Sequence, residues 1–327
     1  MPRLFDFLKV GRLNLRNRIV MPPMATEFST AKGEVTNRLV KHYVERAEDL
    51  GLLIVEHAYV APEGRMSAHQ LGAYSDKLIL GLKRLTEAIH RFETPIALQI
   101  THGGSATTKA TCGVQPLGPS PIANPRGGEV PRALSREEIR DIVAAFTEAA
   151  RRASEAGFDA VEIHGAHGFL LSQFLSPLTN KRTDEYGGAL ENRVRLALEV
   201  IKGIRVQLGE EYPLLYRLGA DDLLPGGLTL EEGTQAAKMI ANAGVNIIDV
   251  SGGLGSRSDL KGPGYYVPLA AAVKEAAGVP VIGVGGITTA EEADTIIRSG
   301  KVDLVAIGRA ILKDSKWASE AIRILRG

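Results

Sequence analysis

Residues 156–177, AGFDAVEIHGAHGFLLSQFLSP, contain the unit that decides the fold. A helical pattern ends at Gly157, and Val161 and Ile163 then alternate with polar neighbours, which is typical of a short buried strand. Glycine suits the end of a helix because it adopts the left-handed conformation that other residues resist. The same order recurs along the chain, where helices are predicted to end at Gly51, Gly157, Gly209, Gly244, Gly278 and Gly300.

Eight short runs of apolar and β-branched residues follow this pattern and predict eight strands. They span residues 18–21, 52–59, 95–101, 159–164, 213–218, 246–250, 280–284 and 303–307. Runs this short and apolar are typical of parallel strands that are covered on both faces. Because no change in composition divides residues 1–327, one closed α/β barrel, a (β/α)8 TIM barrel, is favoured over two domains.

Two segments lie outside the repeating unit. Residues 1–18 alternate apolar side chains around Gly11 and predict a hairpin that caps or plugs the barrel. Residues 102–134, rich in proline and glycine, form a connection longer than the barrel needs. Long loops are more often functional than ornamental, so we interpret 102–134 as a lid over the active site. A surface excursion is the alternative.

The composition of the 327-residue chain excludes several classes of protein. Lys and Arg number 39 and Asp and Glu 38, so neither nucleic acid nor an anionic membrane is an expected partner. The single cysteine, Cys112, excludes an intrachain disulfide and a cysteine-ligated iron–sulfur cluster. Neither a signal peptide nor a membrane-spanning apolar run is evident. We therefore expect a soluble cytoplasmic protein, and the sequence leaves a homo-oligomer open.

The last two predicted strands end in glycines and a cation. Gly285 and Gly286 follow the seventh strand, and Gly308 and Arg309 follow the eighth. These two loops are the usual phosphate site of this barrel. Exposed backbone N–H groups and a fixed positive charge suit a phosphate, which these residues are therefore predicted to bind. Tight turns beside a surface arginine are the alternative.

Gln99 and Arg217 each follow alternating apolar residues and are expected to point into the barrel mouth. A buried arginine needs an anionic partner, and a glutamine amide both donates and accepts hydrogen bonds. Together they suit a planar heterocycle that becomes anionic on reduction. For Gln99 alone, a satisfied core amide is the alternative.

His164 and His167 follow the fourth strand, immediately before Phe169. Zinc requires three or four protein ligands, and the sequence supplies neither an HExxH motif nor further cysteines, so no metal is expected. Two imidazoles can instead donate hydrogen bonds to a substrate carbonyl or hold an anion. We interpret the pair in this way.

These residues resemble the old yellow enzyme (NADH:flavin oxidoreductase) family of FMN-dependent ene-reductases. The chain looks more like the barrel domains of 2-enoate and 2,4-dienoyl-CoA reductases and the bacterial single-barrel members than like the yeast-type enzymes. The resemblance covers the chain from end to end and lies in NRIVMPPM (17–24), ALQITHGG (97–104), LGPSPI (117–122), residues 156–177, NKRTDEYGGALENR (180–193), GGIT (285–288) and IGRA (307–310).

The resemblance implies a barrel that holds FMN and accepts electrons from NADH or NADPH. Its flavin-binding residues are Pro23, Met24 and Ala25 at the reactive edge, His57 through its backbone, Gln99 at the pyrimidine ring, Arg217 at N1–C2=O, and Gly285, Gly286, Gly308 and Arg309 at the phosphate. His164 and His167 would bind the carbonyl oxygen of a small α,β-unsaturated substrate. The substrate would take a hydride at Cβ and a proton at Cα.

The chain departs from the family pattern in four ways. Phe169 replaces the tyrosine that usually donates the Cα proton, Ala25 replaces a cysteine of some bacterial members, and Ser105 replaces a frequent arginine. The chain stops at Gly327, so direct reduction of FMN by the nicotinamide is expected, without an iron–sulfur domain. Two alternatives stay open: a redox-neutral flavin-dependent isomerase, and a phosphate-binding lyase or isomerase without flavin.

Overall fold

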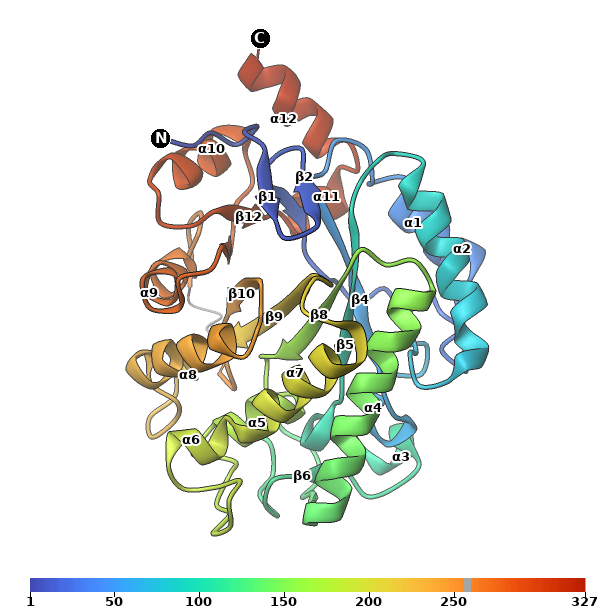
Figure 1. Cartoon of the computed structure of the whole chain (residues 1–327), viewed down its shortest axis with the longest axis vertical. Helices are drawn as coiled ribbons and strands as arrows, with labels where there is room; N and C mark the ends of the chain where they lie inside the picture. The colour runs from blue at the N-terminus through green and yellow to red at the C-terminus, as the bar shows by residue number, and fades with distance from the viewer. Residues whose placement is uncertain (256–259, 327) are drawn as a thin grey trace.

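In the computed structural model, which describes residues 1–255 and 260–326, parallel strands close into a barrel surrounded by helices (Figure 1). The barrel strands are β3 (Ile19–Met21), β4 (Leu52–Tyr59), β5 (Ile96–Thr101), β8 (Ala160–Gly165), β9 (Leu214–Gly219), β10 (Ile247–Ser251), β11 (Val281–Val284) and β12 (Leu304–Ala306). Each strand pairs with its neighbours in the chain, and β12 pairs with β3. The predicted (β/α)8 TIM barrel is confirmed.

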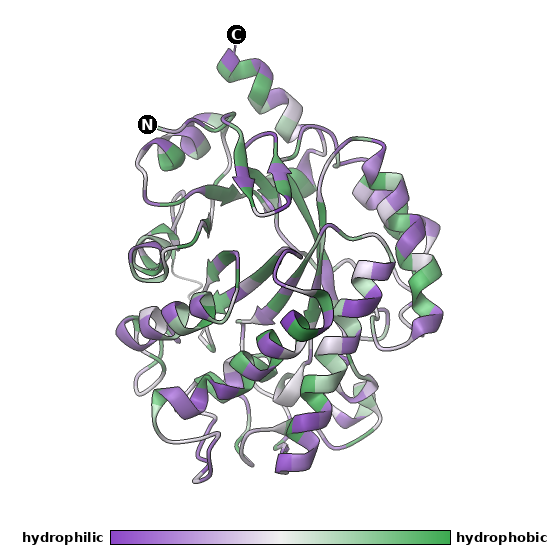
Figure 2. Cartoon of the chain, in the orientation of Figure 1, coloured by the Kyte–Doolittle hydropathy of each residue, from purple (hydrophilic) through white to green (hydrophobic). Residues whose placement is uncertain are grey.

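Helices cover the outside of the barrel. The longer ones are α1 (Asn37–Val44), α2 (Ile79–His90), α4 (Arg136–Glu155), α7 (Arg195–Leu208), α8 (Leu230–Asn242), α9 (Val267–Ala277), α10 (Ala290–Arg298) and α12 (Trp317–Arg326). Short helices α3 (Lys109–Cys112), α5 (Leu170–Leu175), α6 (Leu190–Arg193) and α11 (Arg309–Lys313) lie in the connections. Apolar residues dominate the strands, and polar residues dominate the outward helix faces (Figure 2). Among the described helices, none has the length and apolarity to cross a membrane.

From β5 onward, each strand begins one residue later than predicted. Half of these positions are prolines, which lack the N–H that a strand ladder needs. The other half are Asp159, Asn246 and Asp303, whose side chains act as acceptors at the rim of the barrel. The acceptor distances are 2.8 Å (Asp159 Oδ2 from the Ile96 N–H), 2.8 Å (Asn246 Oδ1 from Leu214) and 3.0 Å (Asp303 Oδ2 from Val281).

Five of the six glycines predicted to end helices have left-handed backbone angles, with φ between +69° and +108°. Gly51 does not, and that prediction is wrong, because α1 already ends at Val44. A Cβ at Gly51 would lie 2.2 Å from the carbonyl oxygen of Asn17. The glycine is therefore required for the close approach of two chain segments before β4.

The N-terminal hairpin consists of β1 (Leu8–Val10) and β2 (Leu13–Leu15), joined by a turn at Gly11. Its buried side chains Val10, Leu13 and Leu15 form one apolar cluster with inward residues of the barrel strands. Figure 1 shows the hairpin at one end of the molecule and α3 and β6 (Leu117–Gly118) at the other. The prediction of a hairpin that closes the barrel is confirmed.

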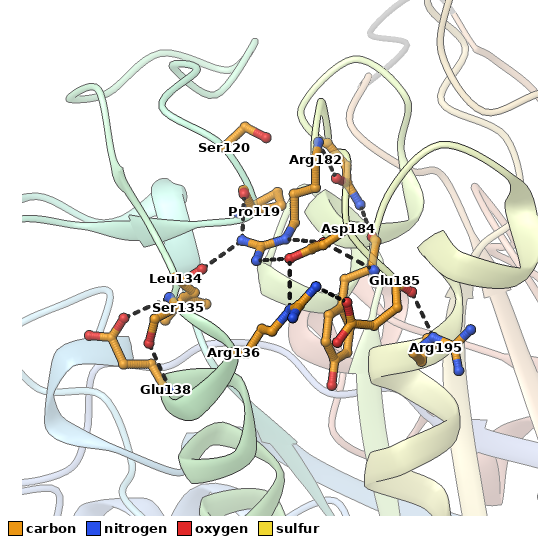
Figure 3. Close-up of polar contacts among 12 residues, drawn as sticks. Pro119, Ser120, Leu134, Ser135, Arg136, Glu138, Arg182, Asp184, Glu185 and Arg195 are labelled. Carbon is orange, nitrogen blue, oxygen red and sulfur yellow. Dashed lines mark hydrogen bonds and ion pairs between the residues drawn. The ribbon is translucent and has the colours of Figure 1, made fainter.

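The loop of residues 102–134 is fastened at its base by Arg182 (Figure 3). Nη1 of Arg182 donates to the carbonyl oxygens of Pro119 (3.1 Å) and Leu134 (2.6 Å). Oδ2 of Asp184 lies 2.6 Å from Nη2 of the same guanidinium. Within the loop, β6 pairs with β7 (Arg132–Ala133) in parallel. The base of the loop is thus tied to the segment that follows α5.

Candidate active site

A cavity of about 190 Å³ lies where β3, β11 and β12 end. Seven predicted cofactor residues line it: Pro23, Met24, Arg217, Gly285, Gly286, Gly308 and Arg309. Gly285 and Gly286 have φ of +120° and +62°, and a Cβ on Gly285 would lie 2.7 Å from the ring of Tyr265. The cavity therefore combines two cations with a backbone turn that requires glycine.

The predicted substrate residues form a second group beside this cavity. The rings of His164 and His167 lie 5.0 Å apart between centroids, and the Phe169 ring lies 4.7 Å from that of His164. The His57 ring lies 5.7 Å from Phe169. His164 is the strand-register partner of Arg217, which links this group to the cavity.

A chain of hydrogen bonds fixes the two imidazoles. The Ala166 N–H donates to Nδ1 of His164 (3.2 Å), so the proton of a neutral His164 lies on Nε2. That Nε2 lies 3.2 Å from Nδ1 of His167, and Nε2 of His167 lies 2.7 Å from Oγ of Ser251. Each ring thereby accepts at Nδ1 and donates at Nε2, and the role of Ser251 as a partner of His167 was not predicted from the sequence.

Burial keeps these histidines neutral. It lowers the pKa of His164 and of His167 well below the usual range, and the charge of Arg217 adds to the effect. Burial also lowers the pKa of His57 to about 4. Neutral rings carry one N–H each, so the pair can donate to an oxygen without adding positive charge.

His57 stands at an irregularity in the barrel. The register between β4 and β5 shifts between Val55 and Ala58, which is how a bulge re-aims a side chain. Nε2 of Gln70 lies 2.8 Å from Nδ1 of His57 and 3.1 Å from its carbonyl oxygen. This contact fixes the ring beside Phe169.

Gln99 lies in a polar layer inside the barrel that reaches the cavity through Arg217. Its Nε2 donates to Oε1 of Glu162 at 2.7 Å, and both side chains are buried. In the same layer, Nε of Arg217 lies 3.4 Å from Oδ2 of Asp249. Glu162 and Asp249 were not predicted, although Glu162 shares the strand register of Gln99 and Asp249 that of Arg217.

The tip of the 102–134 loop reaches the histidine turn. Nη1 of Arg126 donates to the His167 carbonyl oxygen (2.8 Å), and Nδ2 of Asn124 donates to that of Gly168 (2.9 Å). Gln173 of α5 ties the start of the loop to the same turn, through bonds to Gly103 (3.0 Å) and Gly168 (2.7 Å). Loop and histidine turn therefore form one hydrogen-bonded unit.

Comparison with known proteins identifies the chain's relatives. Residues 3–325 match the model of the NADH:flavin oxidoreductase / NADH oxidase family. The chain belongs to this family. The NADH oxidase of Thermoanaerobacter brockii is 44% identical over 98% of this chain but only 50% of the relative. The NADPH dehydrogenase of Clostridium acetobutylicum is 37% identical over 98% of this chain and 95% of the relative.

Solved structures of old yellow enzyme relatives share the barrel. Morphinone reductase has a TM-score of 0.87 at 30% identity and covers 99% of this chain and 90% of its own. The old yellow enzyme homologue of Zymomonas mobilis has a TM-score of 0.87 at 28% identity, with 100% and 93% covered. A 2-naphthoyl-CoA reductase complex reaches 0.94 at 28% identity, but this chain spans only 52% of that chain.

Membership in the NADH:flavin oxidoreductase family makes this chain an NAD(P)H-dependent flavin oxidoreductase with FMN as its cofactor. This membership rules out the alternative of a phosphate-binding lyase or isomerase without flavin. The cavity fits FMN chemically: among the described residues, the buried Nε of Arg217 has no hydrogen-bond partner, and Arg309 and the glycine turn suit a phosphate. Ala25 follows Met24 but is exposed and does not line the cavity.

Proposed function

We propose that this protein is an FMN-dependent ene-reductase that acts on small α,β-unsaturated carbonyl compounds. The observation that carries the proposal is the neutral pair of His164 and His167, hydrogen-bonded to each other and adjacent to Arg217 of the cofactor cavity. Old yellow enzyme homologues among the structural relatives, morphinone reductase included, support a small-molecule substrate.

The residues toward FMN follow from the chemistry of the site. Reduced FMN supplies the hydride for the substrate. Gly285, Gly286, Gly308 and Arg309 would hold its phosphate, Arg217 the edge that becomes negative, Gln99 the pyrimidine ring, and Pro23, Met24, Ala25 and the backbone of His57 the reactive edge. Arg217 and Arg309 are suited to their roles because a guanidinium binds anionic oxygens through charge-assisted hydrogen bonds.

The histidine pair would hold the carbonyl oxygen of the substrate. His167 donates from Nε2 to Ser251, and His164 donates from Nε2 to His167. A carbonyl oxygen that replaces these acceptors would receive both N–H groups. Two such donors stabilise the negative charge that develops on this oxygen when the hydride arrives at Cβ. His164 and His167 would therefore act as catalytic hydrogen-bond donors, with Phe169 against the same substrate.

The 102–134 loop would act as a lid on this site. Its base is held by Arg182, whereas Arg126 and Asn124 near its tip contact the backbone of the histidine turn. A loop in this position can limit the access of water to the carbonyl oxygen, which strengthens the hydrogen bonds from the histidines.

The two half-reactions test the proposal separately. In His164→Ala and His167→Ala, reoxidation by an enone should slow by about 10²–10³-fold, the usual cost of one preorganised donor, whereas flavin reduction by NADH or NADPH should not. His90→Ala is the control, because His90 pairs with Asp159 at the start of β8. Equal losses in both half-reactions, measured by stopped flow, would show that the pair supports the flavin or the fold instead.

A further inference from the structure

The polar layer inside the barrel contains more acidic than basic groups. Glu162 and Asp249 are fully buried, and Gln99 and Arg217 are exposed by only 1% and 6%. Gln99 is the register partner of Glu162, and Arg217 is the register partner of Asp249. Two buried carboxyl groups thus lie within the electrostatic influence of one guanidinium, and Asp249 is within ion-pair distance of it.

The hydrogen bonds of this layer do not satisfy two ionised carboxylates. Oε1 of Glu162 accepts from Gln99, but Oε2 of Glu162 and both oxygens of Asp249 have no hydrogen-bond partner among the described residues. Nε of Arg217 lies 3.4 Å from Oδ2 of Asp249. Burying an ionised carboxylate without hydrogen bonds is costly, and such a group takes up a proton instead.

Among the described residues, Arg217 is the one positive charge that acts on Glu162 and Asp249, whereas Arg309, the other cation of the cavity, lies at the start of α11. The ionisable groups around the layer are His57 from β4, His164 from β8, His167 from the following turn and Arg217 from β9. Burial holds the three histidines neutral. Burial likewise raises the pKa of Glu162, with the negative charge of Asp249 as a further cause, and it raises the pKa of Asp249. Arg217 opposes both shifts but neutralises only one negative charge.

We propose that Glu162 and Asp249 share one proton at neutral pH, and that Glu162 is a positioning residue that sets which end of the Gln99 amide faces FMN. The inference rests on the proposed contact of Gln99 and Arg217 with the flavin. It adds a proton site that the reaction itself does not require.

The amide of Gln99 transmits the protonation state of Glu162. An ionised Glu162 accepts from Nε2 of Gln99, as in this structure, and the amide then directs its oxygen away from Glu162. A protonated Glu162 donates to the amide oxygen, and rotation of the amide then directs its NH2 group away. Because only the NH2 end donates, a protonated Glu162 favours a cofactor that carries negative charge.

Reduction of the cofactor should therefore be coupled to this proton. Hydride from NAD(P)H adds two electrons and one proton, and leaves one extra negative charge on the flavin. The carboxyl pair then holds its proton more tightly, so its pKa is higher with reduced than with oxidised FMN. Between these two pKa values, reduction takes up one additional proton from water, which goes to the carboxyl pair. Below both values the pair is already protonated, and no additional uptake occurs.

The midpoint potential of bound FMN as a function of pH tests the proposal. The midpoint potential of the wild type should fall more steeply toward alkaline pH, by an additional amount of about 30 mV per pH unit. This is the effect of a tenfold change in proton concentration when a two-electron couple takes up one additional proton. Glu162→Gln should lose that additional slope. Asp294→Asn should keep it, because Asp294 is a buried carboxylate that binds the backbone of Leu4 near the N-terminus. An unchanged slope in Glu162→Gln would overturn the proposal.

A second measurement decides the matter if Glu162→Gln does not fold. The reduced-minus-oxidised infrared spectrum of the wild-type holoenzyme should gain the band of a protonated carboxyl group at alkaline pH, and its absence would overturn the proposal. Neither readout uses an enone. A failure of enone reduction would therefore contradict the proposed function, without affecting this inference.

Discussion

Phe169 is the residue whose chemistry differs most from its surroundings. It stands at the N-terminal end of α5, and its ring lies against those of His164 and His57. A phenyl ring cannot donate the proton that the substrate needs at Cα. Of the tyrosines near the strand ends, Tyr186 bonds to Glu199 and Tyr59 stacks on Tyr74. The Tyr266 hydroxyl instead approaches Gly252, whose carbonyl oxygen accepts from the His167 N–H.

Phe169→Tyr should accelerate the oxidative half-reaction, because a general acid next to His164 typically contributes about 10²–10⁴-fold when proton transfer limits the rate. Stopped-flow reoxidation with cyclohexenone and an enal in deuterated water measures both rate and facial selectivity. Tyr266→Phe is the companion variant. If Tyr266 is the acid, flavin reoxidation in this variant should be slower than in the wild type. If the wild type scrambles substrate without flavin reoxidation, the redox-neutral isomerase would be the correct function.

At the residue scale, the sequence predicts which side chains meet but not all of their partners. His164, His167 and Phe169 come together as expected, because they follow one strand end. The inward position of Glu162 was not predicted, because an acidic residue inside a strand is expected to point outward into solvent. Its separation by two residues from His164 was the available signal, since alternate residues of a strand face the same side.

At the scale of elements, the 102–134 loop is positioned by a contact that no sequence pattern reveals. Its length and composition predict a long functional loop. Its anchor, however, is a side chain that bonds two main-chain carbonyl groups, and any residue supplies a carbonyl. Arg136 lies beside Arg182 and pairs with Asp184 and Glu185 (Figure 3). The Arg182 side chain is 10% exposed, whereas that of Arg136 is 60% exposed.

Arg182→Ala should destabilise the protein by about 2–4 kcal/mol, because it leaves two buried carbonyl oxygens without their donor and removes the 2.6 Å ion pair with Asp184. Hydrogen exchange of residues 117–134 should accelerate more than that of the barrel strands. Arg136→Ala is the matched control from the same network, and its exposed ion pairs predict a loss of only about 0–1 kcal/mol. Equal losses in urea unfolding would contradict the role of Arg182 as the anchor.

Across the whole molecule, the two ends of the barrel have different tasks. Apolar residues of the hairpin and of the strand starts fill one end, and charged groups and glycines occupy the other. The repeated order of glycine and strand was sufficient to predict the barrel, because it marks where each helix ends and the next strand begins. It could not predict the exact strand starts, which depend on the pairing of Asp159, Asn246 and Asp303 with neighbouring strands.

This division predicts that stability and cofactor binding can be changed independently. Leu15 is fully buried where β2 closes the barrel, so Leu15→Ala should cost about 2–5 kcal/mol in the free energy of unfolding. Phe7→Ala is the control directly before the same hairpin, because the Phe7 side chain is 57% exposed and its removal should cost little. The FMN dissociation constant of Leu15→Ala should stay at the wild-type value under conditions where the protein is folded, since Arg217, Arg309 and the glycine turn lie at the opposite end.

Urea unfolding of the apoprotein and fluorescence titration with FMN measure the two quantities separately. A fall in FMN affinity that matches the loss of stability would mean that the barrel couples its two ends.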